Sequence, residues 1–127
     1  MIIDYFPGKT FSTETDGVCA ITDVVVTVGA ASTDTSIIAA VSGKVIQIIG
    51  GNLRSVGAVT AVTFKSASGG TNKRAYQVPV NTAATPNVEL EPNPLGHFRT
   101  NVGEGLFADN SGADQLTVSL SYITYTP

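Results

Sequence analysis

The sequence has no tryptophan, one cysteine and one histidine among its 127 residues. A single cysteine excludes an internal disulfide and a cysteine-rich zinc site. Cys19 stands between Val18 and Ala20, which is typical of a small buried hydrophobic residue, and nothing beside it in the sequence would activate a thiolate nucleophile.

Charged residues are scarce, at 13% of the chain against a usual share of roughly 25%. The seven Lys and Arg residues are scattered, only Lys73 and Arg74 are adjacent, and the formal net charge is -3. Without a basic stripe to neutralise phosphates, we expect no nucleic-acid partner. A surface this poor in charge must carry Thr, Ser, Asn and Gly, or be covered in part by other chains.

Long apolar runs are also absent from the sequence. The first ten residues, MIIDYFPGKT, lack a basic region followed by an apolar stretch, so they predict no signal peptide. No run approaches the roughly 20 residues that cross a bilayer, so we expect no membrane partner. We expect a protein that is made in the cytoplasm and stays soluble, unless it leaves inside a larger assembly.

What the chain does contain is Thr, Val and Ile in short runs separated by Gly, Asn, Ser and Pro, the pattern of strands and turns. The clearest run is LTVSLSYITY at residues 116–125, which alternates apolar and hydroxyl residues as a half-buried strand does. Near its end Ile123 and Tyr125 place large side chains on the outer row, which indicates that this part is covered too. Further strands are expected at about residues 23–28, on both sides of a hinge at Ser42 and Gly43, at about 58–64, and in AYQVPV, NVEL, GHFRT and GLFAD.

Roughly eight or nine strands and no convincing helix predict an all-β protein, with a single antiparallel β-sandwich of jelly-roll type over residues 19–127. A closed barrel is the alternative. A short helix from Asp34 to Val41 is the alternative for one segment, but Thr35, Ile37 and Ile38 favour a strand there.

Residues 1–18 differ from the rest, because their apolar residues do not alternate cleanly and Pro7-Gly8 interrupts them. This segment is either a first strand docked on its own core or an N-terminal arm that contacts a neighbouring chain. Its large apolar residues are Ile2, Ile3, Tyr5, Phe6 and Phe11.

The stretch GKVIQIIGG, residues 43–51, is apolar on both rows of a predicted strand. A strand with one wet face should alternate apolar and polar residues. One row is explained by the sandwich core, so the row with Val45 and Ile49 needs a second cover: the arm, a long loop or another subunit. We expect Val45 and Ile49 in a subunit interface.

Candidates for enzyme chemistry are few. His97 lies in a turn entering a strand, and any Ser-His-Asp arrangement would have to use it. Glu89 and Glu91 would share a face of a strand and could form an acid/base pair, but the simpler interpretation buries Val88 and Leu90 and leaves both carboxylates in water. We expect no catalytic residue.

The polar cluster at Asp109, Asn110 and Asp114 offers oxygen ligands for calcium. Its spacing does not match a calcium-binding loop, and such clusters usually build a turn. We expect no bound metal and no cofactor.

Two segments carry a resemblance to a known family. They are IIAAVSGKVIQIIGGNLRSVGAVTAVTFKSASGG and NPLGHFRTNVGEGLFADNSGADQLTVSLSYITY, which together span about residues 37 to 125 without the middle segment 73–91. Their Ala-Val-x-Gly-Lys hinge, GAVTxxFKS hairpin, NPxGxF turn and VGEGL bulge, taken as a set, resemble small all-β structural proteins of tailed bacteriophages, of the capsid decoration or cement kind. Similar proteins often carry an aromatic residue where His97 stands, and many lack so long an N-terminal segment.

This resemblance implies a jelly-roll-like homotrimer on the exterior of a phage capsid, where it would bridge and stabilise subunits of the major capsid protein. It implies a structural virion protein rather than an enzyme. The alternative is a phage tail, fibre or host-attachment module that binds carbohydrate, and a small hydrolase acting through Glu89, Glu91 or His97 is a third hypothesis.

Overall fold

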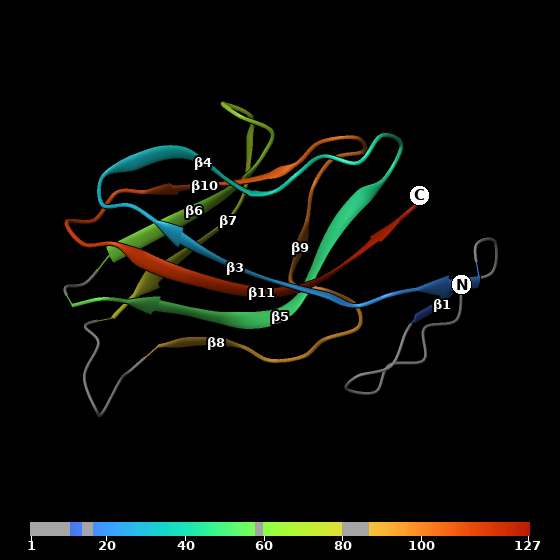
Figure 1. Cartoon of the computed structure of the whole chain (residues 1–127), viewed down its shortest axis with the longest axis horizontal. Helices are drawn as coiled ribbons and strands as arrows, with labels where there is room; N and C mark the ends of the chain where they lie inside the picture. The colour runs from blue at the N-terminus through green and yellow to red at the C-terminus, as the bar shows by residue number, and fades with distance from the viewer. Residues whose placement is uncertain (1–10, 14–16, 58–59, 80–86) are drawn as a thin grey trace.

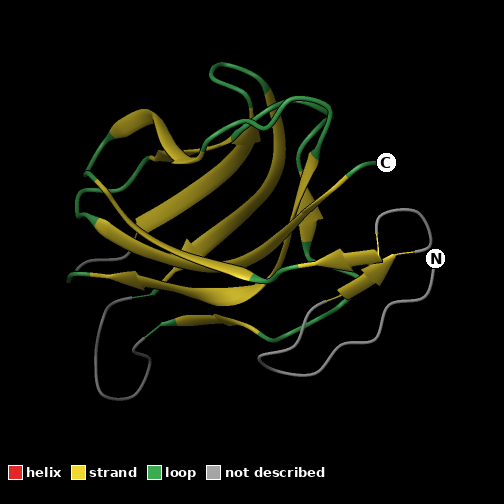
Figure 2. Cartoon of the chain, turned by 45° about the vertical axis from the view of Figure 1, so that its right-hand side comes forward, coloured by secondary structure: helices red, strands yellow, loops and turns green. Residues whose placement is uncertain are grey.

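The computed structural model describes residues 11–13, 17–57, 60–79 and 87–127, and it contains strands and no helix among them. These residues form eleven strands, shown in Figures 1 and 2. The strands are β1 (Phe11–Thr13), β2 (Gly17–Cys19), β3 (Thr22–Val28), β4 (Ser32–Ile38), β5 (Val45–Ser55), β6 (Thr60–Ser66), β7 (Thr71–Val78), β8 (Val88–Leu90), β9 (Phe98–Arg99), β10 (Leu106–Asn110) and β11 (Leu116–Tyr125).

Two antiparallel sheets pack face to face. One has the strand order β4-β10-β6-β7, and the other has the order β3-β11-β5-β8 with β9 also paired to β5. Strands β1 and β2 form a separate two-stranded sheet. The predicted all-β sandwich is confirmed, while its assignment to the jelly-roll type stays a prediction.

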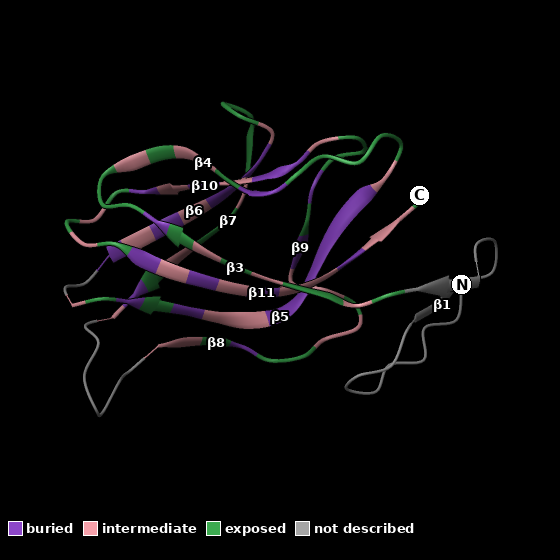
Figure 3. Ribbon diagram, in the orientation of Figure 1, coloured by how far each residue is buried: buried purple, intermediate pink, exposed green. Residues whose placement is uncertain are grey.

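The core lies between the two sheets and follows the alternation of the sequence. On β6, Thr60, Val62 and Phe64 are buried on one side, as the sequence predicts. Figure 3 shows the same alternation along β11. The ring of Phe64 stacks on Phe98 with centroids 5.0 Å apart and meets Tyr76 edge-on at 6.1 Å, so aromatic contacts join strands of both sheets.

Strand β5 changes register in its middle. Ile48 and Leu53 both belong to the core although they are an odd number of residues apart, because one extra residue interrupts the pairing of β5 with β11. Gly51 follows this bulge with φ 138°, where a Cβ atom would overlap the carbonyl oxygen of Ser119. Only glycine fits that position without displacing the neighbouring strand.

The alternative helix at residues 34–41 does not form, since β4 covers residues 32–38. Asp34 interrupts β4 instead: it has a φ of 55°, and it lies where the pairing of β4 with β10 shifts register. The hinge predicted at Ser42 and Gly43 falls in the connection between β4 and β5, where Gly43 has a φ of 73°.

Candidate interaction surface

The outer face of the five-stranded sheet carries a second apolar cluster near the start of β5. Ile49 and Ile123 are buried there, with Ile21 and Tyr125 packed against them. Val45 pairs with Tyr125 across the strands and is only 4% exposed. The sequence-based expectation that the end of β11 is covered is confirmed by the burial of Ile123.

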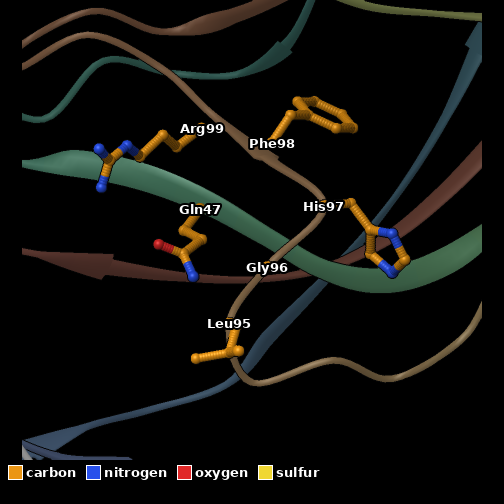
Figure 4. A pocket seen from close by; sticks show the side chains of 6 residues that line it. All are labelled: Gln47, Leu95, Gly96, His97, Phe98 and Arg99. Carbon is orange, nitrogen blue, oxygen red and sulfur yellow. The ribbon is translucent and has the colours of Figure 1, made fainter.

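The connection between β8 and β9 supplies part of the cover. The backbone N–H of Asn93 donates to the carbonyl of Ile49 at 2.8 Å, and that of His97 donates to the carbonyl of Ile48 at 2.8 Å. Between them Gly96, with a φ of 83°, lies so close to the side chain of Gln47 that a Cβ atom would be 2.5 Å from its Nε2. Figure 4 shows the segment from Leu95 to Arg99 beside Gln47, around a pocket of about 170 Å³.

The chain therefore shields this row with its own residues. The expectation that Val45 and Ile49 lie in a subunit interface rests on the need for a neighbouring chain to cover them. That need does not exist, since Ile49 is 0% exposed without any neighbour, and the interface itself stays a prediction. A strand with two apolar rows needs two covers, and here the second is the connection between β8 and β9 together with Ile21 and the end of β11.

Large apolar side chains remain exposed in the loops that approach the start of β5. Val41 is 43% exposed, Val102 53% and Leu95 80%. The loops with Val41 and Val102 are joined, because the N–H of Gly103 donates to the carbonyl of Lys44 at 2.8 Å. The Nζ of Lys44 also donates to the hydroxyl of Thr126 at 2.7 Å, so the C-terminus lies at the same end.

We call this end of the molecule the arm end: the loops 39–44 and 100–105, Leu95, the C-terminus and the hairpin β1–β2. Figures 1 and 2 show β1 and β2 beyond the sandwich on the side where the C-terminus lies. Phe11 is the first residue of β1, whereas Ile2, Ile3, Tyr5 and Phe6 lie outside the described residues.

Of the candidate catalytic residues, His97 helps to hold the connection between β8 and β9 in place. A ring nitrogen of His97, Nε2, lies 2.7 Å from the carbonyl oxygen of Glu91, and Arg74 donates to the carbonyl oxygen of His97 at 2.8 Å. Glu89 and Glu91 are exposed while Leu90 is buried, as the simpler interpretation predicts. Glu89 accepts a hydrogen bond from Asn87 at 2.7 Å.

The polar cluster near the end of β10 is divided between two structural tasks. Asn110 is buried, accepts from Thr60 and Gly112, and donates to the carbonyl oxygens of Gly29 and Asp114. It thereby ties the β3–β4 connection, the β10–β11 connection and the start of β6 together at the end opposite the arm end. Among the described residues, no group of three or more His, Cys, Asp and Glu side chains could hold a metal ion.

Asp109 takes part in a network that the sequence does not reveal. Lys65 is 6% exposed on the outer side of β6, forms an ion pair with Asp34, and has its Nζ 3.0 Å from Asp109 Oδ2. Asp109 Oδ1 also accepts from the N–H of Asp34 at 2.8 Å, which fixes the irregular turn in β4. A lysine inside the apolar run AVTFKS is the one signal that could have suggested a buried pair.

The ion pairs keep these groups charged. The hydrogen bond from Lys65, followed by the N–H of Gly69, lowers the pKa of Asp34, and the bonds to Asp34 and Asp109 raise the pKa of Lys65. Lys65 therefore stays protonated and has no lone pair for nucleophilic attack. Glu104 behaves alike, since hydrogen bonds from Ser66 and Asn101, each 2.8 Å long, lower its pKa.

No helix that could cross a membrane occurs in the part of the chain that the structure describes. Comparisons of the sequence with protein-family models and with curated proteins found no match.

Proposed function

We propose that this chain is a structural virion protein of a tailed bacteriophage, a decoration or cement protein that binds the major capsid protein as a homotrimer. The proposal starts from the sequence resemblance of residues 37–125 to that family. It is supported by the arm end, where a two-stranded hairpin and exposed apolar loops extend from a sandwich whose own core is complete.

The hairpin β1–β2 is the observation that carries the proposal. Within the part of the chain that the structure describes, its two strands pair only with each other, in the register Phe11 with Cys19 and Thr13 with Gly17. Isolated two-stranded hairpins are marginally stable in water, so such an element gains stability when it packs against another surface. In this proposal the hairpin and residues 1–10 contact a neighbouring subunit or the coat.

The exposed loops would add to the same contact. Exposed apolar groups that gather at one end of a molecule mark interaction sites more often than isolated ones do. Val41 and Val102 lie on loops bonded to each other, and Leu95 is on a third segment that approaches the same end. Burial of these apolar side chains would contribute about 25 cal/mol per Å² to the contact. The work of the protein would be mechanical: it bridges coat subunits.

The first test is the oligomeric state and capsid binding of the purified protein. We expect light scattering to return a trimer of the 13.1 kDa chain, and co-sedimentation with expanded capsids. A monomer at high concentration would contradict the trimer, and failure to sediment with capsids would contradict the decoration role.

The second test removes the arm. Deleting residues 1–19 leaves Ile21 in place over Ile49, so the sandwich should remain folded while trimer formation or capsid binding is lost. The substitutions Val41→Ser and Val102→Ser should weaken the same binding. Val56→Ser is the matched control, because Val56 is also about half exposed, at 51%, in a connection at the other end of β5. If Val41→Ser, Val102→Ser and the control Val56→Ser all bind capsids alike, the arm end is not the contact surface.

A further inference from the structure

We infer that the outer face of the five-stranded sheet carries a second, separate site: a shallow polar trough over β3, β11, β5 and β8 that binds a neutral oligosaccharide. This site is independent of the arm end and of the proposed place of the protein on a virion. It lies beyond the bulge in β5, where the outer rows change from apolar to polar.

The trough follows one row of outward-facing residues across four strands. Ser119 pairs with Val25 on one side and with Asn52 on the other, and Asn52 pairs with Glu89. Their neighbours along the strands, such as Val118, Leu120, Leu53 and Leu90, are buried in the core, so this row faces outward. Four strands about 4.8 Å apart span about 14 Å, which suits a short oligosaccharide.

The surface is hollowed where side chains are small or missing. One hollow of about 320 Å³ lies between Asp23, Val25 and Ser121, with the backbone of Gly51 and Leu120 in its lining. A second, of about 450 Å³, lies between Arg54, Val56 and Thr117. Asn52 and Ser119 line both hollows, so the two lie side by side. Gly51, whose backbone lies against Ser119 and Leu120 of β11, is fixed as glycine by that close approach.

The lining offers donors and acceptors that the chain does not use. Asn52 and Arg54 make no side-chain hydrogen bond or ion pair with any other residue that the structure describes. Asp23 accepts from the hydroxyl of Ser121 at 2.6 Å and keeps its second carboxylate oxygen for a further donor. An amide, a guanidinium, hydroxyls and a carboxylate on a flat surface match the paired hydroxyl groups of a sugar ring.

Charge and exposure favour a neutral sugar over the other ligand classes. Asp23 and Glu89 outnumber the single cation Arg54, which disfavours phosphates and other polyanions. The row of Val25, Ser119, Asn52 and Glu89 lacks the aromatic residues and Met that are enriched at the centre of protein interfaces. Val25, 68% exposed, offers one apolar contact to the C–H groups of a sugar ring. Without an aromatic platform the affinity per site is low, and a multimeric protein would gain binding by avidity.

The test uses the full-length protein, labelled with ¹⁵N, and three neutral trisaccharides as probes: maltotriose, cellotriose and chitotriose at millimolar concentration. We expect at least one of them to shift the amide signals of residues 23–25, 50–54 and 117–121 and to leave the arm-end loops unchanged. An array of neutral glycans, read with the protein clustered on beads, extends the panel.

Two variants locate the site. Ser119→Leu fills both hollows and Asn52→Ala removes the central amide, and each should reduce glycan binding at least tenfold. Gln77→Ala is the matched control, since Gln77 is an exposed amide on β7 of the other sheet and should bind as wild type does. No shift and no array signal with any neutral glycan would overturn the inference, as would shifts outside the trough. A trimer lost in Ser119→Leu would also overturn it, because the face would then be a subunit contact.

The experiments distinguish a failure of the glycan-binding inference from a failure of the proposed decoration role. The decoration role is measured by capsid binding and depends on residues at the arm end, whereas the trough is measured by glycan binding and depends on Asn52 and Ser119. A protein that sediments with capsids but binds no neutral glycan would retain the first proposal and lose the second.

Discussion

Along β5 and β11 the outer face of the five-stranded sheet consists of two halves that share the same strands. In the half nearer the arm end, Gln47 pairs with Ile123 and both are buried. In the other half, Asn52 pairs with Ser119 and both are accessible. Between the halves lies the bulge before Gly51. One extra residue thus lets a single strand present apolar residues to two covers at one end and polar residues to solvent at the other.

The comparison teaches that an apolar outer row does not by itself require a partner chain. The cover of Ile49 comes from residues distant in sequence, namely Ile21 before β3 and Ile123 in the last strand. Of the large apolar residues that remain exposed, Val25 lies in β3, whereas Val41, Val56, Leu95 and Val102 lie in loops, where no alternation marks them.

The largest effect on stability should follow from the substitution Gly51→Ala beside the bulge. The added methyl group overlaps the carbonyl of Ser119, and the φ of 138° is unfavourable for alanine, so we expect a loss of about 3–5 kcal/mol in the free energy of unfolding. Urea denaturation measures it. Gly29→Ala is the control, because a methyl group there meets no atom within 4 Å and should change stability by less than about 0.5 kcal/mol. Equal stability of the two variants would mean that the bulge does not divide the face.

Removing a side chain from the covered half should have the next largest effect. Ile49→Ala leaves a cavity beside Ile21, Ile123 and Tyr125, and we expect a loss of about 2–3 kcal/mol in the free energy of unfolding. The loss should be the same at low and high protein concentration, since the cover is within the chain. A loss that grows with protein concentration would show that a neighbouring chain covers Ile49 after all.

The sequence predicted the sandwich and most of its strands because short β-branched runs, turn residues and alternation are local signals. The prediction that the end of β11 is covered is confirmed by Ile123, and Tyr125 is partly buried beside it, because two large residues on an outer row are visible in the sequence. The cover of Ile49 could not be predicted, since it depends on Ile21 meeting Ile123 in the folded sheet and on the segment 91–97 bonding to the backbone of β5. The partners of Lys65 were equally hidden, because Asp34 and Asp109 come from two other strands and meet only in the folded sheet.

The ion-paired groups around Lys65 should contribute more to the stability of the fold than the unpaired polar groups of the trough. The folded pKa of Asp34 is below its unfolded value, so its contribution to stability is present above about pH 3.9 and is lost as the pH falls through the folded pKa. Lys65→Met should therefore be less stable near neutral pH and should lose less stability between pH 4 and pH 2.

Thermal unfolding followed across that pH range measures the difference. Glu104→Gln is the control, because the pKa of Glu104 is also lowered but by Ser66 and Asn101, and this variant should keep the part of the acid loss that belongs to Asp34. Unchanged acid sensitivity in Lys65→Met would mean that the network does not stabilise the sheet.

The smallest effect should come from the open half of the face. Asn52→Ala removes an amide that bonds to no other described residue, so we expect the free energy of unfolding to change by less than about 0.5 kcal/mol. Asn52 and Ile49 lie three residues apart on one strand, and only the second is covered, so their alanine variants measure what the cover contributes. Asn52→Ala could instead lower the free energy of unfolding as much as Ile49→Ala does. The two halves would then contribute equally to the stability of the fold, and the polar half would have a structural role rather than a binding role.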